Sequence, residues 1–482
     1  MRSVFSNGKM DFLRRTGNIS PMKLPATRVA VLDAVALSRQ MMEHMPRLSA
    51  WAERQRISSF PPAFPAVTCT AQSSYITGLS PEEHAIPGNG WYNRNMSEVQ
   101  FWKQSNKLVQ GPRIWEKLKN LYGPSFTCAK LFWWYNMYST ADWSITPRPM
   151  YPADGRKIFD IYTQPMDLRE TIKRDLGEFP FPTFWGPMAG IGATQWIVDS
   201  VRWIEQKYRP NLNLVYLPYL DYDLQKFGPS SGEAAKAART MDDLLCDLID
   251  FLEREGVTPI VVSEYGISDV SRTVALNRLF RERGWITVKP ELGTEMLDGG
   301  ASKAFAVADH QVAQIYVNDP SVREEVKALL STTPGVEEIR ETDFSGLNPA
   351  ACERLPDFTA VAAPDTWFTY YYWTDDAKAP DFARCVDIHR KPGYDPAEMF
   401  FDPALSFPML HAALFLLKKK LGFRALMKVI PLNGDQVKGS HGRDNVPDSQ
   451  QPVFIGPAGL PEVHSPRDVH EAILAAFASG CQ

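Results

Sequence analysis

Residues 28–33, Arg28-Val29-Ala30-Val31-Leu32-Asp33, form a short apolar run that is rich in β-branched side chains and ends in a carboxylate. Such a run predicts a buried β-strand, and the helical pattern of residues 36–54 follows it. Further strand-like and helix-like segments alternate along the chain, at 212–219, 232–255, 258–263, 270–284, 304–308 and 312–317. This alternation predicts an α/β fold, a three-layer α/β/α sandwich with a mostly parallel central sheet.

Four acidic residues stand where predicted strands end. They are Asp33, Asp221, Glu264 and Asp309. Ligands of open α/β sheets bind at the carboxyl ends of the strands, so we expect these carboxylates to gather at one site.

The composition of the 482-residue chain excludes several classes of protein. Its 44% hydrophobic and 22% charged residues are typical of globular proteins, and no apolar run is long enough to cross a bilayer. The net charge of −4 argues against a nucleic-acid duplex as partner. Residues 1–21 carry no signal-peptide pattern and are expected to be a disordered leader. The six cysteines have no CxxC spacing, so we expect reduced thiols and a cytoplasmic protein.

The chain is expected to consist of one core and two insertions. Nine of the thirteen tryptophans fall within residues 91–203, so residues 96–200 are interpreted as an aromatic-rich cap over the sheet. A second, smaller insertion is expected at 331–402, and its run 367–373 reads as a buried strand. The catalytic core then comprises 22–95, 201–330 and 403–482.

Residues 409–430 combine apolar positions with Lys418, Lys419, Lys420 and Lys428. One interpretation is a helix packed on the core with a solvated lysine face. The other is a basic amphipathic helix that makes peripheral contact with an anionic membrane. No feature of the sequence sets the oligomeric state.

The most specific motif lies in residues 64–92. Thr68 precedes the pair Thr77-Gly78 by nine residues, and Leu79-x-Pro81-x-x-His84-x-Ile86 and Asn89 follow. This order resembles the nucleotide pyrophosphatase/phosphodiesterase branch of the alkaline phosphatase superfamily. The resemblance implies that Thr68 attacks phosphorus and that Asn89 binds a non-bridging phosphoryl oxygen. A fixed amide donor stabilises charge that develops on such an oxygen.

The same resemblance implies two divalent metal ions, usually zinc. Asp33, Asp221 and His441 match family ligands, and Thr68 also matches a ligand. Two family histidines are replaced, by Gln225 and by Tyr265, and Glu264 stands in the place of an aspartate. Neither glutamine nor tyrosine is a usual zinc ligand.

Two Asp-His pairs could return a missing imidazole. They are Asp309-His310, at the end of a predicted strand, and Asp387-Ile388-His389, before a predicted loop. If neither does so, all-oxygen ligation would favour manganese or magnesium.

These motifs predict a metal-dependent hydrolase of small-molecule phosphate esters with a phosphoryl-threonine intermediate. A sulfatase is excluded because Cys69 is not followed by the required Pro and Arg, and no GxGxxG or GxxxxGK[ST] follows a predicted strand. The alternative is a non-catalytic binding protein on the same fold with a degraded metal site. The sequence does not distinguish monoester, diester and phosphonate substrates.

Overall fold

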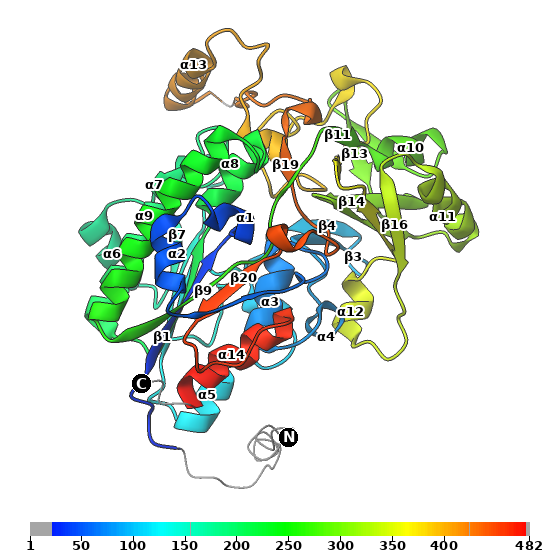
Figure 1. Cartoon of the computed structure of the whole chain (residues 1–482). Helices are drawn as coiled ribbons and strands as arrows, with labels where there is room; N and C mark the ends of the chain where they lie inside the picture. The colour runs from blue at the N-terminus through cyan, green and yellow to red at the C-terminus, as the bar shows by residue number, and fades with distance from the viewer. Residues whose placement is uncertain (1–21, 155, 424, 479–482) are drawn as a thin grey trace.

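A computed structural model describes residues 22–154, 156–423 and 425–478. The expected leader, residues 1–21, lies outside the described residues. An eight-stranded sheet occupies the centre of the molecule, in the order β2-β20-β9-β1-β8-β5-β6-β7 (Figure 1). Its strands are β1 (Arg28–Ala34), β2 (Arg56–Ser59), β5 (Cys128–Leu131), β6 (Trp143–Pro147), β7 (Ile161–Gln164), β8 (Leu212–Leu217), β9 (Val257–Val262) and β20 (Val453–Gly456).

The five strands β9, β1, β8, β5 and β6 run parallel, and β20 and β7 run antiparallel to their neighbours. Alternate side chains of β1 enter two different hydrophobic clusters. Ala30 and Leu32 pack with α7 (Ile191–Tyr208) and α9 (Gly232–Arg254). Val29 and Val31 pack with α3 (Thr68–Thr77), α5 (Ile114–Tyr122) and α14 (Pro466–Ala478). The predicted three-layer α/β/α sandwich is therefore confirmed.

The single helix predicted over residues 36–54 is wrong. The segment forms two short helices, α1 (Arg39–Met42) and α2 (Pro46–Ala52). Proline lacks an N–H donor and restricts the residue before it, so Pro46 starts a new helix rather than continuing the first.

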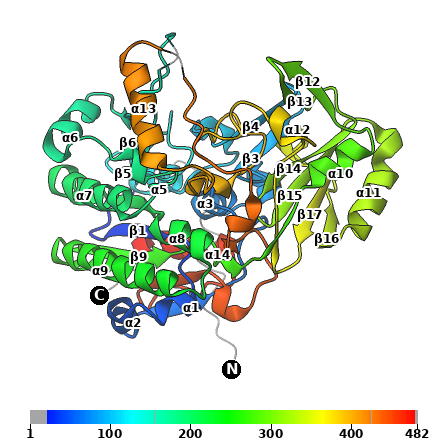
Figure 2. The same ribbon diagram turned by 90° about the horizontal axis from the view of Figure 1, so that it is seen from above.

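Residues 304–308 and 312–317 do not belong to the parallel sheet, contrary to expectation. β14 (Ala304–Asp309) and β15 (Val312–Val317) form a tight hairpin in a second, antiparallel sheet with β17 (Phe358–Ala362) and β16 (Val336–Glu341). Only two residues separate the strands, whereas a parallel pair needs a long crossover. Helices α10 (Leu276–Glu282) and α11 (Arg323–Thr332) accompany this sheet (Figure 2).

Residues 96–200, expected as a cap, contribute β5, β6 and β7 to one side of the central sheet as well as loops above it. In the run 367–373 only β18 (Thr366–Phe368) is a strand, although the side chains are buried. The other elements are β3 (Gly90–Asn93), β4 (Glu98–Phe101), β10 (Ser268–Asp269), β11 (Arg272–Val274), β12 (Thr287–Glu291), β13 (Thr294–Asp298), β19 (Gly439–Ser440), α4 (Pro81–His84), α6 (Leu168–Leu176), α8 (Tyr219–Phe227) and α12 (Pro349–Arg354).

Helix α13 (Pro408–Lys420) contradicts the expectation of a helix packed on the core. It stands off the body of the protein, and its leucines at 410, 414 and 417 are exposed (Figure 1). Across the described ranges, no helix is both long and apolar enough to cross a membrane.

Candidate active site

The site lies where three neighbouring parallel strands end. Asp33 is the penultimate residue of β1, and Glu264 lies two residues beyond β9. Asp221 belongs to the first turn of α8, which directly follows β8. All three carboxyl groups are buried, and they lie together: Gln72 bridges Asp33 and Glu264, and Tyr265 contacts both Thr68 and Asp221. Asp309, the fourth carboxylate expected here, ends β14 of the second sheet instead.

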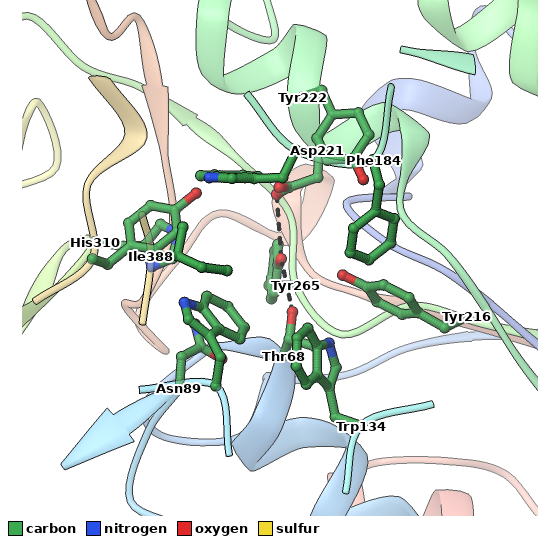
Figure 3. Close-up of a pocket in the computed structure, with 13 residues that line it drawn as sticks. Thr68, Asn89, Trp134, Phe184, Tyr216, Asp221, Tyr222, Tyr265, His310 and Ile388 are labelled. Atoms are coloured by element: carbon green, nitrogen blue, oxygen red, sulfur yellow. Dashed lines mark hydrogen bonds between the residues drawn. The ribbon is translucent and has the colours of Figure 1, made fainter. Parts of the chain in front are cut away.

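Thr68, on helix α3, contacts one of these carboxylates. It is the first residue of α3, and its Oγ1 donates a hydrogen bond of 2.6 Å to Glu264 Oε2. The same hydroxyl lies 3.2 Å from the Tyr265 hydroxyl. Thr68 also lines a pocket, so its oxygen is accessible to a bound molecule (Figure 3).

Gln72 is a site residue that the sequence analysis missed. It lies one helical turn after Thr68, and its Nε2 donates to Asp33 Oδ2 at 3.0 Å and to Glu264 Oε1 at 2.7 Å. Its Oε1 accepts the backbone N–H of Trp134 at 2.8 Å. The i, i+4 spacing from Thr68 was the available signal, because it places both side chains on one face of the helix.

Asp33 and Glu264 are close enough to hydrogen-bond to each other. Burial, and then the charge of Glu264, raises the pKa of Asp33 far above its usual range. Burial also raises the pKa of Glu264, and hydrogen bonds from Asp33, Thr68 and Gln72 oppose this rise. The two groups therefore share a proton that resides on Asp33, which leaves Glu264 as the carboxylate.

Tyr265 connects this pair of carboxyl groups to Asp221. Its hydroxyl donates to Asp221 Oδ1 at 3.2 Å while it contacts Thr68, as the dashed lines of Figure 3 show. Burial, and then the charge of Asp221, raises the pKa of Tyr265 well above its usual value. The phenol is therefore neutral and acts here as a hydrogen-bonding group.

Gln225 lies one turn after Asp221 on α8. Its Nε2 donates to Asp221 Oδ2 at 2.6 Å, and its Oε1 accepts the hydroxyl of Tyr394 at 2.9 Å. Both polar atoms of Gln225 are therefore engaged within the protein. Burial, followed by the charge of Glu264, raises the pKa of Asp221 to about 7.

His441 and His310 lie face to face, with ring centroids 3.7 Å apart. Tyr265 stacks on the outer face of His441 and Tyr394 on that of His310, each at 3.6 Å. Nδ1 of His441 contacts the Ala66 carbonyl at 2.7 Å, and Nδ1 of His310 contacts Asp309 Oδ1 at 2.8 Å.

These contacts fix the tautomers of the two imidazoles, because only an Nδ1–H donates to an oxygen acceptor. Burial lowers the pKa of both rings well below the usual value, so both are neutral. The two Nε2 atoms are buried and have no hydrogen-bond partner among the described residues. They carry free lone pairs.

The hairpin tip between β14 and β15 brings His310 to the site. His389, the other candidate, is exposed and does not line the pocket. Asp309 lies behind His310, and its oxygens accept Asn89 N at 2.8 Å and Asn89 Nδ2 at 3.1 Å.

Asn89 lines the pocket beside Thr68, as expected of a group that binds a phosphoryl oxygen. Its Oδ1 accepts the backbone N–H of Cys69 at 3.0 Å, which orients the amide. His84, by contrast, is structural: it is buried against Ser74 Oγ and the backbone N–H of Ile86.

The donor set was tested for its fit to metal ions. Within the described ranges, no three or more His, Cys, Asp or Glu side chains are positioned as a ready metal-binding group. The chemistry of Asp221, His310 and His441 nevertheless fits one divalent ion, because two orphaned imidazole nitrogens lie near a carboxylate, with His441 Nε2 3.8 Å from Asp221 Oδ1. A second ion between Asp33 and Glu264 fits less well, because both Glu264 oxygens and Asp33 Oδ2 accept hydrogen bonds and Asp33 Oδ1 alone of the four has no partner among the described residues.

The pocket above Thr68 encloses about 480 Å³, including its open mouth. Aromatic rings dominate its walls, and no lysine or arginine is among the residues that line it. The aromatic lining residues are Trp102, Trp134, Phe184, Trp185, Tyr216, Tyr222, Tyr265 and Tyr394. Four of them, at positions 102, 134, 184 and 185, come from the tryptophan-rich segment, so this segment shapes the space next to the nucleophile.

Comparisons with known proteins identify the family and the fold. The sequence profile of the family described as type I phosphodiesterase / nucleotide pyrophosphatase matches residues 29–395. An uncharacterized pyrophosphatase/phosphodiesterase of Schizosaccharomyces pombe is 26% identical over 246 residues, which cover 49% of this chain and only 44% of that relative.

Two solved structures share the fold over 95% of this chain. An inactive variant of murine ectonucleotide pyrophosphatase / phosphodiesterase 5, in complex with AMP, is 13% identical with a TM-score of 0.56 and is covered to 96%. Phosphonoacetate hydrolase from Sinorhizobium meliloti 1021, in complex with phosphonoacetate, is 14% identical with a TM-score of 0.57 and is covered to 100%.

Proposed function

The chain belongs to the type I phosphodiesterase / nucleotide pyrophosphatase family, and from that premise we propose that it hydrolyses small-molecule phosphate esters with Thr68 as nucleophile and Glu264 as general base. The family match confirms the resemblance inferred from residues 64–92. One observation carries the proposal, the 2.6 Å hydrogen bond from Thr68 Oγ1 to Glu264 Oε2.

A threonine hydroxyl is a weak nucleophile unless a base takes its proton. In the proposed first step, Glu264 accepts the proton of Thr68 while Oγ1 bonds to phosphorus and the bond to the leaving oxygen breaks. The leaving oxygen takes a proton from solvent. Water then attacks phosphorus, the bond between phosphorus and Oγ1 breaks, Glu264 returns its proton to Thr68, and the proton lost by the water passes to solvent.

Three neighbouring groups support these roles. Gln72 and the proton on Asp33 hold Glu264 in place, since both contact its carboxylate. Asn89 Nδ2 donates one of its two hydrogens to Asp309 Oδ1, which leaves the second for a phosphoryl oxygen.

We propose one divalent metal ion per chain, held by Asp221, His310 and His441. Two imidazole nitrogens and one carboxylate oxygen suit zinc. Such an ion supplies Lewis-acid stabilisation of charge on the phosphoryl group. The resemblance implies two ions instead. Gln225 and Tyr265 stand at two histidine positions of the family, and both form hydrogen bonds within the protein. Gln72 forms a hydrogen bond to Glu264 in the same way.

For the substrate, we propose a nucleotide or another ester with a planar aromatic group. Aromatic walls favour stacking. AMP is bound by the murine neighbour. The bacterial neighbour binds phosphonoacetate, which carries a carboxylate. No lysine or arginine lines the pocket of this chain, so a carboxylate of the substrate would find no cationic side chain there.

The competing proposal is a binding protein on the same fold, and the loss of two histidines to Gln225 and Tyr265 favours it. A panel of nucleotide esters, p-nitrophenyl phosphates and phosphonoacetate, assayed with added zinc or manganese, separates the two. Turnover that disappears in Thr68→Ala supports the enzyme. Binding of AMP with no turnover of any ester supports the binding protein.

A further inference from the structure

Residues 403–423 and 425–428, called the 403–428 arm below, leave the body of the protein and return to it. The base of the arm is closed by a hydrogen bond from Asp402 N to the Val429 carbonyl at 2.8 Å. The N–H groups of Val429 and Ile430 donate to the Arg384 carbonyl, which attaches the chain to the body of the protein after the arm. Helix α13 forms the central part of the arm and stands beyond α8 (Figure 1).

The arm exposes a continuous apolar stripe. Leu410, Leu414, Leu417 and Leu421 are 56%, 48%, 51% and 66% exposed. Their spacing of four, three and four residues places all of them on one face of a helix. Phe407 and Phe423 flank the helix in the sequence and are 76% and 64% exposed. A globular protein rarely leaves such a stripe uncovered, so a partner is expected.

Charge identifies the kind of partner. At 100° per residue, Lys418 and Lys420 project to opposite sides of the leucine stripe, and both are exposed. Lysines in that position keep their ammonium groups in the headgroup layer while the leucines enter the acyl region. The chain as a whole carries a net charge of −4, so this cationic rim is a local feature.

We propose that the 403–428 arm docks the protein on an anionic membrane surface. A second copy of the chain is a weaker fit, because a self-complementary contact would bring two sets of lysines together. The segment that precedes the arm carries Ile388 and Tyr394, which line the pocket. Docking would therefore hold the pocket-bearing end of the protein near the lipid surface.

The test is co-flotation of the full chain with vesicles. Wild type is expected to float with vesicles of phosphatidylcholine and phosphatidylglycerol, and less with pure phosphatidylcholine or in high salt. A stripe variant, Leu410→Glu with Leu414→Glu and Leu417→Glu, and a charge variant, Lys418→Gln with Lys420→Gln, are each expected to lose on the order of tenfold or more in vesicle affinity.

A matched control changes three exposed apolar residues elsewhere, Met96→Glu, Met166→Glu and Leu292→Glu, and adds the same charge. It is expected to bind the mixed vesicles at least half as well as wild type. The proposal is overturned if wild type does not float, or if the stripe variant floats as well as the control. It is also overturned if light scattering finds a dimer that the stripe changes dissociate while vesicle binding stays absent.

Discussion

The hydroxyl of Thr68 and the carboxylate of Glu264 are separated by 196 residues in the sequence and by 2.6 Å in the structure. One begins a helix and the other follows a central strand. In the proposed mechanism Glu264 is the base for Thr68, so the activity is expected to depend on the protonation state of this glutamate.

Thr68→Ala should abolish phosphoester hydrolysis without unfolding the protein, because it removes the attacking oxygen. Thr68→Ser should keep part of the rate. Hydrolysis of a p-nitrophenyl nucleotide ester measures both. The matched control is Thr70→Ala, since Thr70 lies in the same helix but its hydroxyl donates to the Ile86 carbonyl. Wild-type turnover by Thr68→Ala would exclude this nucleophile.

Glu264→Gln should lower kcat by about 10²- to 10⁴-fold, since an amide does not accept the proton of Thr68. The pH profile gives a second readout. Because burial raises the pKa of Glu264, wild-type kcat/KM should fall as pH drops through a value above the usual carboxylate range. The acidic limb should be missing in Glu264→Gln. An unchanged limb in that variant would assign the base elsewhere.

Several parts of the site could be predicted from local sequence. β1 follows from its strand pattern, and Thr68 and His441 follow from short motifs shared with the family. The β14–β15 hairpin was also predictable, because two residues cannot form a parallel crossover. His310 reaches the site only because that hairpin belongs to a second sheet, so its place depended on the correct topology.

Gln72→Ala should destabilise the protein by about 2 to 4 kcal/mol. It removes the amide donor from Asp33 Oδ2 and Glu264 Oε1 and the acceptor from the Trp134 N–H, and each such loss costs about 1 to 3 kcal/mol. Urea unfolding measures the change. Gln195→Ala is the control, because Gln195 bonds only to Asp199 on its own helix. Equal stability of both variants would mean that the Gln72 bridge contributes nothing.

The role of Gln72 shows what local sequence does not contain. Its two carboxylate partners follow different strands, and their separation depends on the packing of α3 against the sheet. The aromatic wall of the pocket likewise depends on tertiary packing. The tryptophans marked residues 91–203 as unusual, but which rings face the pocket is decided by tertiary contacts.

Zinc binding should depend on three side chains. We expect about one ion per chain, and His310→Ala or His441→Ala should weaken binding by on the order of tenfold to a hundredfold or more. Elemental analysis and a competition titration measure this. His389→Ala is the control, since that side chain is exposed away from the pocket. Two ions per chain in the wild type, with loss of binding in Asp33→Asn, would contradict the one-ion site and support the two-ion site of the family.

The metal-free protein should lose stability as pH rises from about 4 to about 7. Burial raises the pKa of Asp221 to about 7, so the folded state keeps a proton that the unfolded state loses near 3.8. The loss from this group is on the order of 4 kcal/mol at most, and it is complete above pH 7. Asp221→Asn should flatten the curve, as followed by thermal unfolding in EDTA. An equally steep curve in the variant would contradict the assignment.

The central claim is that phosphorus is transferred to Thr68, and peptide mapping by mass spectrometry after an acid quench during turnover tests it most directly. The account predicts a phosphoryl group on Thr68 in wild type and none on residue 68 in Thr68→Ala. A phosphoryl group on another residue, or turnover of several substrates with no phosphorylated peptide at any quench time, would contradict it.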